Sequence, residues 1–359
     1  MSDNLKVGIV GCGGIAQVEH IPGFLRLKNV VLQAVCDKNE NLAQQTAAKY
    51  PNTRVYYNMS DMLSNEDLGI VDICTPPQIH APLAIEALQN GCNVLIEKPM
   101  ALKTSDCDNM INAAGKHGGK LCIIHNRLFE PTLLKAKELV ANGSIGDFIG
   151  MRILISDHRD EMIMKKDYWI HRLPGGLIGE TGPHFVYMSL AFLKEITKVD
   201  IFAKNILQHS WAPFDEFRIE LEGETAMSSI TVSYASNRHY AHVDIMGTEG
   251  VLHLDLSSGL LIRYGQKVSS RPIPSAHYFL NISSQVIGGL TTNAIKLATG
   301  RLRLGHSVVI ERFVNYIQGI SQNPVTAEDG RETVRVMEML VERLHEKYGA
   351  YYIRMKSAN

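Results

Sequence analysis

The fold of this chain is decided by the stretch Lys6-Val-Gly-Ile-Val-Gly11-Cys-Gly13-Gly-Ile-Ala16. An apolar strand runs into a G-x-G-x-x-A turn, and a helix follows. Gly11 permits a tight turn, Gly13 leaves room for a pyrophosphate, and Ala16 lets helix and strand pack closely. The N–H groups at the helix N-terminus would face the phosphates. The candidate cofactor-binding residues of this turn are Gly11, Gly13, Gly14, Ile15 and Ala16.

The end of the second predicted strand supports a dinucleotide site. About 20 residues past the glycine turn this strand ends in Asp37, where a carboxylate would bind the ribose hydroxyls. A carboxylate there would repel a 2′-phosphate, which favours NAD over NADP. The neighbouring Lys38 could accommodate that phosphate, so NADP is the alternative cofactor.

Apolar runs alternate with helical patterns in the first third of the chain. Several runs are almost continuous in Val, Ile, Leu and Cys, which is typical of parallel strands buried on both faces. The predicted strands are Lys6–Gly11, Val31–Asp37, Arg54–Tyr57, Ile70–Thr75, Asn93–Glu97 and Lys120–His125. Between them we expect a helix over Ile79–Asn90 that closes on Gly91, and a helix toward His117 that Ser105 and Asp108 cap. The pattern predicts a doubly wound α/β domain, with a Rossmann parallel sheet, over residues 1–125.

The pattern changes after about Asn126, where a second domain is predicted to begin. A helix over Pro131–Asn142 precedes short segments that alternate polar and apolar residues, as in an antiparallel or mixed sheet. The predicted strands are Asp147–Asp157, Lys198–Leu207, Phe217–Glu222, Ala226–Ser233, His242–Gly247 and Gly250–Leu256. A last helix, Arg331–Tyr348, would end at Gly349. We therefore expect residues 126–359 to form an α+β domain with a large open, mostly antiparallel sheet, whose C-terminal helices can pack back on the first domain.

The composition excludes several classes of protein. The 359 residues are 45% hydrophobic and carry a net charge of −1, so we expect folded domains without affinity for nucleic acid or membrane surfaces. None of the six cysteines belongs to a C-x-x-C pair or a zinc-like spacing, so buried, reduced thiols, no metal site and a cytoplasmic location are predicted. The uncharged segment Pro272–Ile295 is too polar to span a membrane and is predicted to be buried or to form an interface.

Two later strand ends carry more specific motifs. The fourth strand ends in Asp72-Ile-Cys-Thr75-Pro76-Pro77-Gln-Ile-His80, and the fifth ends in Glu97-Lys98-Pro99. In this order they resemble the T-P-x-x-x-H and E-K-P signatures of the Gfo/Idh/MocA oxidoreductases, and the resemblance covers essentially the whole chain. It implies an NAD(P)-dependent dehydrogenase that acts on CH–OH groups. The cofactor contacts that it implies are Thr75, Pro76, Pro77, His80, Glu97 and Lys98.

A third motif, Gly175-Gly176-Leu-Ile-Gly179-Glu180-Thr-Gly-Pro183-His184, resembles the D-x-x-x-H motif of the same family. The resemblance implies that His184 takes the hydroxyl proton of the substrate, assisted by Lys98, as hydride leaves the same carbon. Glu180 stands where the family usually has Asp, and on a helix it would share a face with His184. Pro183 suggests that this helix starts nearer to Pro183 than to Glu180. The candidate catalytic residues are Lys98, His184 and Glu180.

Substrate contacts are expected after the sixth strand and ahead of the double glycine, where related enzymes often carry Arg or Trp. An aromatic ring beside a guanidinium can stack on a sugar or hold a phosphate, although a packed loop would explain the same residues. The candidates are Asn126, Arg127, Tyr168, Trp169, His171 and Arg172, with His158, Arg159 and Asp160 as further ones.

These features predict an oxidoreductase that transfers hydride from a secondary alcohol of a sugar, nucleotide sugar or cyclitol to NAD and gives a ketone. Arg127 and Arg172 slightly favour a nucleotide sugar. Two alternatives stay open: an NAD-retaining glycosidase, which oxidises and re-reduces its sugar, and a non-catalytic NAD-binding regulator. The open face of the second sheet predicts a homodimer or homotetramer, as in related enzymes.

Overall fold

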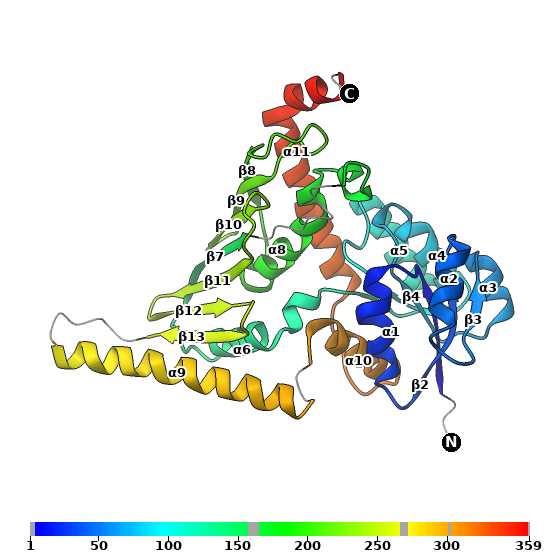
Figure 1. Cartoon of the computed structure of the whole chain (residues 1–359), viewed down its shortest axis with the longest axis horizontal. Helices are drawn as coiled ribbons and strands as arrows, with labels where there is room; N and C mark the ends of the chain where they lie inside the picture. Colours follow the sequence, from blue (N-terminus) through cyan, green and yellow to red (C-terminus); the bar gives the residue numbers. More distant parts are fainter. Residues whose placement is uncertain (1–3, 157–164, 266–271, 301–302, 358–359) are drawn as a thin grey trace. The chain divides into compact units, whose positions relative to one another are not determined.

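The computed structural model describes residues 4–156, 165–265, 272–300 and 303–357 of the chain. It divides into two compact units (Figure 1). The first comprises Met1–Phe129 and Arg303–Glu338, and the second comprises Glu130–Leu302 and Met339–Asn359. The first division lies close to the predicted boundary near residue 126. Part of the C-terminal helices belongs to the first unit, an arrangement that the sequence allowed.

A six-stranded parallel sheet forms the core of the first unit. Its spatial order is β3-β2-β1-β4-β5-β6, and every neighbouring pair is parallel. The strands are β1 (Leu5–Val10), β2 (Val30–Cys36), β3 (Arg54–Tyr56), β4 (Ile70–Ile73), β5 (Asn93–Ile96) and β6 (Leu121–Ile123). All six predicted strands are confirmed to within two residues at each end. The order reverses between β1 and β4, and ligands bind at the carboxyl ends of strands at such a point.

Helices join these strands and complete the first unit. They are η1 (Ala16–His20), α1 (Ile21–Leu25), α2 (Glu40–Ala47), α3 (Met59–Asn65), α4 (His80–Gln89), α5 (Thr104–His117) and α10 (Gly305–Ile317). The predicted helix before Gly91 is confirmed as α4, and Gly91 has the left-handed φ of 79° that such an ending requires. No sequence pattern pointed to α10. It packs on α1 and on the segment η3 (Asn126–Phe129), and it buries Val309, Ile310, Phe313 and Val314.

The predicted cap of α5 is wrong. The helix begins at Thr104, and the Thr104 N–H donates to a carboxylate oxygen of Glu338 at 3.1 Å. Asp108, which was expected to help Ser105 cap the helix, instead forms an ion pair with Arg331. Glu338 and Arg331 both come from α11 (Ala327–Ser357), more than 200 positions away. A remote carboxylate therefore replaces the local capping box.

The second unit is built on a seven-stranded sheet with the order β13-β12-β11-β7-β10-β9-β8. The strands are β7 (Phe148–Ser156), β8 (Lys198–Lys204), β9 (Glu216–Glu222), β10 (Met227–Ser233), β11 (Tyr240–Gly247), β12 (Gly250–Asp255) and β13 (Leu260–Tyr264). β10 and β7 are parallel, and the other neighbouring pairs are antiparallel. The predicted mostly antiparallel sheet is confirmed, although β13 was not predicted. The helix α6 (Pro131–Ala141) contacts β12 and β13, and α8 (Leu177–Leu193) contacts β7 and β10.

Two helix ends differ from the predictions. α8 begins at Leu177 and contains Pro183, whereas a start near Pro183 was expected. Gly175 and Gly176 have φ values of 81° and 61°, so the chain turns there and the helix can begin earlier. α11 continues through Gly349 to Ser357, so the predicted stop at that glycine is wrong. A glycine weakens a helix without necessarily ending it.

The uncharged segment forms the long helix α9 (Pro272–Ala298), which runs alongside β13 (Figure 1). The side-chain amide of Gln285 donates to the carbonyl of Arg263 and accepts from its N–H, so α9 covers this edge of the sheet. The prediction that the segment is buried is wrong for the single chain, because Phe279 and Leu280 are 61% and 66% exposed. Its role as an interface stays a prediction.

The cysteines behave as core residues. All six are buried and form no disulfide. Burial raises the pKa of Cys12 to about 11 and that of Cys36 to about 12, so both stay protonated at neutral pH. This confirms the expectation of small apolar thiols. Among the helices that the structure describes, none has the length and apolar character needed to cross a membrane.

Candidate active site

The glycine turn lies between β1 and the first helix, as predicted. Gly11 has a φ of 95°, and a Cβ at this position would lie 2.8 Å from the backbone of Cys74. Both conformation and space therefore require glycine. In the described part of the chain no atom lies within 4 Å of a Cβ built at Gly13 or Gly14. Ala16 is fully buried and Ile15 is partly exposed, so the turn presents its backbone outward over a closely packed helix.

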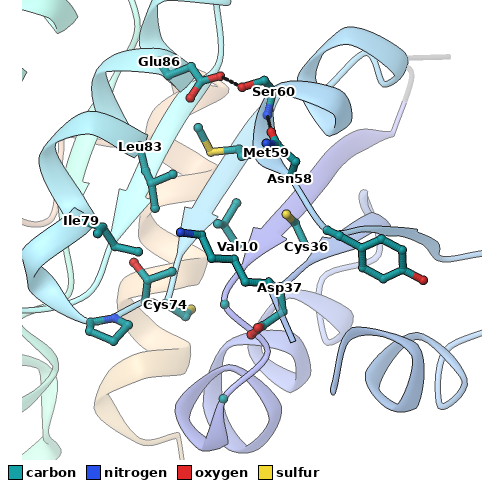
Figure 2. A pocket seen from close by; sticks show the side chains of 16 residues that line it. Val10, Cys36, Asp37, Asn58, Met59, Ser60, Cys74, Ile79, Leu83 and Glu86 are labelled. Atoms are coloured by element: carbon teal, nitrogen blue, oxygen red, sulfur yellow. Dashed lines mark hydrogen bonds between the residues drawn. The ribbon is translucent and has the colours of Figure 1, made fainter. Parts of the chain in front are cut away.

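Asp37 follows β2 and is tied to this turn. The Cys12 N–H donates to Oδ2 at 2.8 Å, and the Asn39 N–H donates to Oδ1 at 2.8 Å. The two hydrogen bonds, one of which comes from the glycine turn, fix the carboxylate. Figure 2 shows Asp37 among the residues that line the neighbouring pocket. Each oxygen keeps a further lone pair, so the carboxylate can still accept from a ligand. Lys38 is exposed beside it.

A pocket of about 400 Å³ opens beside the turn (Figure 2). Predicted cofactor residues form one side of it, namely Gly11, Gly13, Asp37, Lys38, Thr75 and Pro76. The other side comes from the start of α3 and from α4, and it was not predicted. It combines apolar side chains with hydrogen-bonding ones, namely Asn58, Met59, Ser60, Ile79, Leu83 and Glu86. Apolar side chains next to hydrogen-bonding ones are suited to a heterocyclic base.

One sequence signal could have located this second side. Asn58 accepts a hydrogen bond from the Ser60 N–H at 2.8 Å and so caps α3. An Asn directly after a short strand is a common helix-start signal, and it would have placed α3 at the pocket. Glu86 accepts a hydrogen bond from the Ser60 hydroxyl, which ties α4 to α3 across the pocket (Figure 2).

His80 links the two strand-end motifs. Its Nδ1 lies 2.9 Å from the carbonyl oxygen of Pro99, and its Nε2 lies 2.8 Å from that of Thr75. The side chain is fully buried, so it acts through these two loops and does not face a ligand directly. Pro77 is buried beside it, whereas Pro76 is exposed toward the pocket.

Lys98 lies just beyond β5, at the carboxyl edge of the parallel sheet, and its peptide bond to Pro99 is cis. Its side chain is half-buried, and its backbone N–H donates to Oε2 of Glu97 at 3.0 Å. Glu97 itself is buried. Its carboxylate therefore supports the turn from which the Lys98 side chain emerges.

Behind Glu97 lies a line of polar side chains, all buried except the partly exposed His306, whose grouping no sequence motif indicated. The ring of His20 is fully buried, with Nδ1 at 2.8 Å from Oδ2 of Asp72 and Nε2 at 2.8 Å from Oε1 of Glu97. The same Oε1 lies 3.4 Å from Nε2 of His306, on α10. His306 Nδ1 lies 3.4 Å from the side-chain amide nitrogen of Asn126. We call the four ionisable residues Asp72, His20, Glu97 and His306 the buried relay.

The groups of the buried relay stabilise one another's charges. Burial alone would lower the pKa of His20, but the charge of Asp72 raises it well above its ordinary value. Burial alone would raise the pKa of Glu97, but hydrogen bonds from His20 and His306 bring it well below its ordinary value. Ligand atoms of His20, Glu97 and His306 all lie within 4.8 Å of one another, a spacing that could also hold a metal ion. The expected absence of a metal stays a prediction.

The second unit carries the other predicted catalytic residues on α8. Glu180 and His184 lie four residues apart on this helix, and both are half-buried. His184 Nδ1 lies 2.6 Å from the hydroxyl of Tyr187, which is 2% exposed. Tyr187 was not predicted, although its three-residue spacing from His184 places it on the same helix face. It holds the imidazole ring in one orientation.

The predicted substrate residues are divided between the two units. Asn126 is buried and Arg127 is half-buried on η3, in the first unit with Lys98. In the second unit, the rings of Tyr168 and Trp169 lie 6.0 Å apart where η4 (Trp169–Arg172) begins. His171 is half-buried and Arg172 is exposed. His158, Arg159 and Asp160 lie outside the described residues.

The fold and the strand-end geometry define a class of protein, the NAD-binding oxidoreductases with a Rossmann domain and a second α+β domain. Residues 5–125 match the family model described as "Oxidoreductase family, NAD-binding Rossmann fold". Residues 133–253 match the GFO/IDH/MocA C-terminal domain. The chain belongs to the Gfo/Idh/MocA family, as its motifs predicted.

Several similar proteins support the assignment of the chain to this class of oxidoreductases. Oxidoreductase P35 of Formosa agariphila is 29% identical over 204 residues, which are 55% of this chain and 64% of that protein. D-glucoside 3-dehydrogenase of Escherichia coli is 32% identical over 146 residues, which are 41% of this chain and 42% of that protein. The chain thus matches less than two thirds of the length of these relatives. The WlbA dehydrogenase of Bordetella pertussis, solved with NADH and UDP-GlcNAcA, shares the fold, with a TM-score of 0.77, 19% identity and 97% of each chain covered.

Proposed function

We propose that this protein is a dehydrogenase that oxidises a secondary alcohol of a sugar, nucleotide sugar or cyclitol to a ketone, with NAD as acceptor. The observation that carries the proposal is the position of Lys98, which lies at the carboxyl edge of the sheet that also holds the glycine turn and the Asp37 pocket. Ligands of open α/β sheets bind at this edge. The sugar dehydrogenase among its relatives and the nucleotide-sugar complex of the WlbA dehydrogenase support this choice of substrate class.

The residues of the pocket fit NAD. The hydroxyl oxygen of Thr75 is buried and has no hydrogen-bond partner among the described residues, and the space at Gly13 is open. Asp37 would accept from the ribose hydroxyls, and a base would lie between α3 and α4. A 2′-phosphate would bring negative charge against Asp37, which supports NAD over NADP.

The proposed chemistry assigns one role to each catalytic residue. The nicotinamide supplies the hydride acceptor. His184, oriented by Tyr187, removes the hydroxyl proton, and Lys98 donates a hydrogen bond to the same oxygen as negative charge develops there. Glu180, one turn before His184, would influence the charge of that imidazole. Tyr168, Trp169, His171 and Arg172, with Asn126 and Arg127, would contact the sugar or its phosphates.

Assembly and location belong to the same proposal. Buried, unbridged thiols suit a reducing compartment such as the cytoplasm. The sheet of the second unit would pair with another copy to give a homodimer or homotetramer.

The test is NADH absorbance with protein, NAD and a panel of cyclitols, free sugars and nucleotide sugars. Lys98→Ala and His184→Ala should bind NAD normally yet turn over at least ~100-fold more slowly, because general acid–base catalysis contributes on that order. Lys116→Ala and His117→Ala, at exposed positions on α5, are the matched controls. Near-normal rates in either active-site variant would refute the mechanism. Glycoside cleavage without accumulated NADH would favour the glycosidase instead.

A further inference from the structure

We infer that His20 is a positioning residue of this oxidoreductase, a buried imidazolium that holds Glu97 and, through Glu97, the Lys98 turn. The expected effect of His20 on catalysis rests on the proposed role of Lys98, whereas the inferred charge of His20 does not. Nothing in the glycine motif requires a histidine at this position, which lies four residues beyond Ala16.

The geometry of His20 requires two N–H groups. Both ring nitrogens lie 2.8 Å from a carboxylate oxygen, one of Asp72 and the other of Glu97. A neutral imidazole carries a single N–H and would leave one nitrogen lone pair facing an anionic oxygen. The ring is fully buried, so solvent does not relieve that repulsion. A doubly protonated ring satisfies both contacts with charge-assisted hydrogen bonds.

The surroundings of Glu97 favour a carboxylate over a carboxylic acid. Its Oε2 accepts from the Lys98 N–H at 3.0 Å, and its Oε1 faces both His20 and His306. A carboxylic acid would lose acceptor capacity that these contacts use. Asp72 is fully buried as well, and its Oδ2 also accepts from the Cys74 thiol at 3.6 Å. One imidazolium between two carboxylates therefore offsets one of the two buried negative charges.

The same distances argue against a metal at this position. Ligands at ~2.0–2.1 Å from a tetrahedral zinc are separated by about 3.3 Å. Nε2 of His20 and Oε1 of Glu97 are 2.8 Å apart, which is the length of a hydrogen bond. A shared proton fits this spacing better than a cation.

The charge of His20 has a mechanical consequence. His20 belongs to the helix that follows the glycine turn, and Glu97 belongs to the turn that presents Lys98. The ion pair thus joins the phosphate-binding helix to the catalytic turn. Without it, Glu97 would be a buried carboxylate with less compensation and would rotate, and the backbone of Lys98 would lose its support. His306 extends the same connection to Asn126.

Nitrogen-15 NMR of protein labelled at histidine tests the protonation directly, without any substrate. We expect protons on both ring nitrogens of His20 at pH 8. In Asp72→Asn, which keeps the shape and removes one charge, the His20 ring should become titratable at or below pH 8. A single ring proton at pH 8 in the native protein would overturn the inference, and so would a stoichiometric metal that is lost in His20→Gln.

Kinetics test the positioning role. His20→Gln should keep NAD affinity within about threefold and KM within about threefold, while kcat falls at least tenfold; His117→Gln is the control. Unchanged kcat in a folded His20→Gln protein would contradict the role. If His20→Gln does not fold, Asp72→Asn replaces it, with the same expected split between kcat and KM. Should Lys98→Ala retain activity, the proposed function fails, but the NMR result still decides the charge of His20.

Discussion

At the scale of single residues, Asp37 is the side chain that we propose to select between NAD and NADP. Its carboxylate is fixed by two backbone N–H groups and borders the pocket. We expect Asp37→Asn to remove the charge and to keep only one of these two hydrogen bonds, because an amide has a single acceptor oxygen. Affinity for NADP relative to NAD should then rise about tenfold or more. Fluorescence titration with both nucleotides measures the ratio, and Asp61→Asn, an exposed carboxylate on α3, is the control. An unchanged ratio would show that Asp37 does not select the cofactor.

His125 gives a prediction about stability and pH. Burial lowers its pKa to about 4, so the folded protein keeps it neutral, whereas the unfolded chain takes up a proton below about pH 6.5. Stability therefore decreases as pH falls from about 6.5 to about 4. Between pH 7 and pH 5 this residue should lower the free energy of unfolding by about 2 kcal/mol. Urea unfolding at pH 7 and pH 5 measures this loss of stability, which should be smaller in His125→Gln than in the native protein by about that amount. An equal loss in both proteins would argue against a neutral buried imidazole.

At the scale of elements, the start of α5 depends on a side chain from α11. The carboxylate of Glu338 accepts from the Thr104 N–H, which has no local side-chain cap. Glu338→Ala should lower the free energy of unfolding by about 1 kcal/mol, the usual value of such a cap. Chemical denaturation measures the change against Glu342→Ala, an exposed position on the same helix. Equal stability of the two variants would mean that the hydrogen bond contributes nothing.

Helix α8 shows how neighbouring glycines define the start of the helix that carries two candidate catalytic residues. Two positive φ angles at Gly175 and Gly176 turn the chain, and a Cβ at Gly179 would lie 2.2 Å from the carbonyl oxygen of Pro174. The helix can therefore begin at Leu177 and include both Glu180 and His184. The glycines of this motif thus allow His184 to lie on the helix, and Tyr187 then orients the His184 ring.

At the scale of the whole molecule, α9 is a candidate for a subunit contact, in addition to the open face of the second sheet. The helix is uncharged from Pro272 to Ile295 and exposes several large apolar side chains, namely Phe279, Leu280, Ile287, Leu290 and Ile295. If it lies in an interface, Leu280→Lys with Ile287→Lys should reduce the oligomer to smaller species because two charges would be buried there. Sedimentation velocity measures this, with Lys116→Glu as control. An unchanged sedimentation coefficient would exclude α9 from the interface.

The arrangement of the chain into units was partly visible from local pattern. The strands of both sheets could be predicted from the sequence. Buried parallel strands are apolar throughout, and half-exposed strands alternate polar and apolar residues. The sequence allowed the C-terminal helices to return to the first unit, but no local pattern identified α10 or the elements that it contacts. This return results from the packing of α10 against α1 and η3, which precede it by a large part of the chain.

The sequence by itself determined the Rossmann sheet, the mostly antiparallel second sheet, the glycine turn and Asp37. Each of these features depends on a short, local pattern of residues. Lys98 and His184 became candidates through the resemblance of their motifs to those of the Gfo/Idh/MocA family. Only the tertiary structure brought His20, Asp72, Glu97 and His306 together, and only it placed Tyr187 against His184 and Glu338 at α5. Charge pairing and capping act through space, so residues far apart in sequence can form them wherever folding leaves their atoms within hydrogen-bond distance.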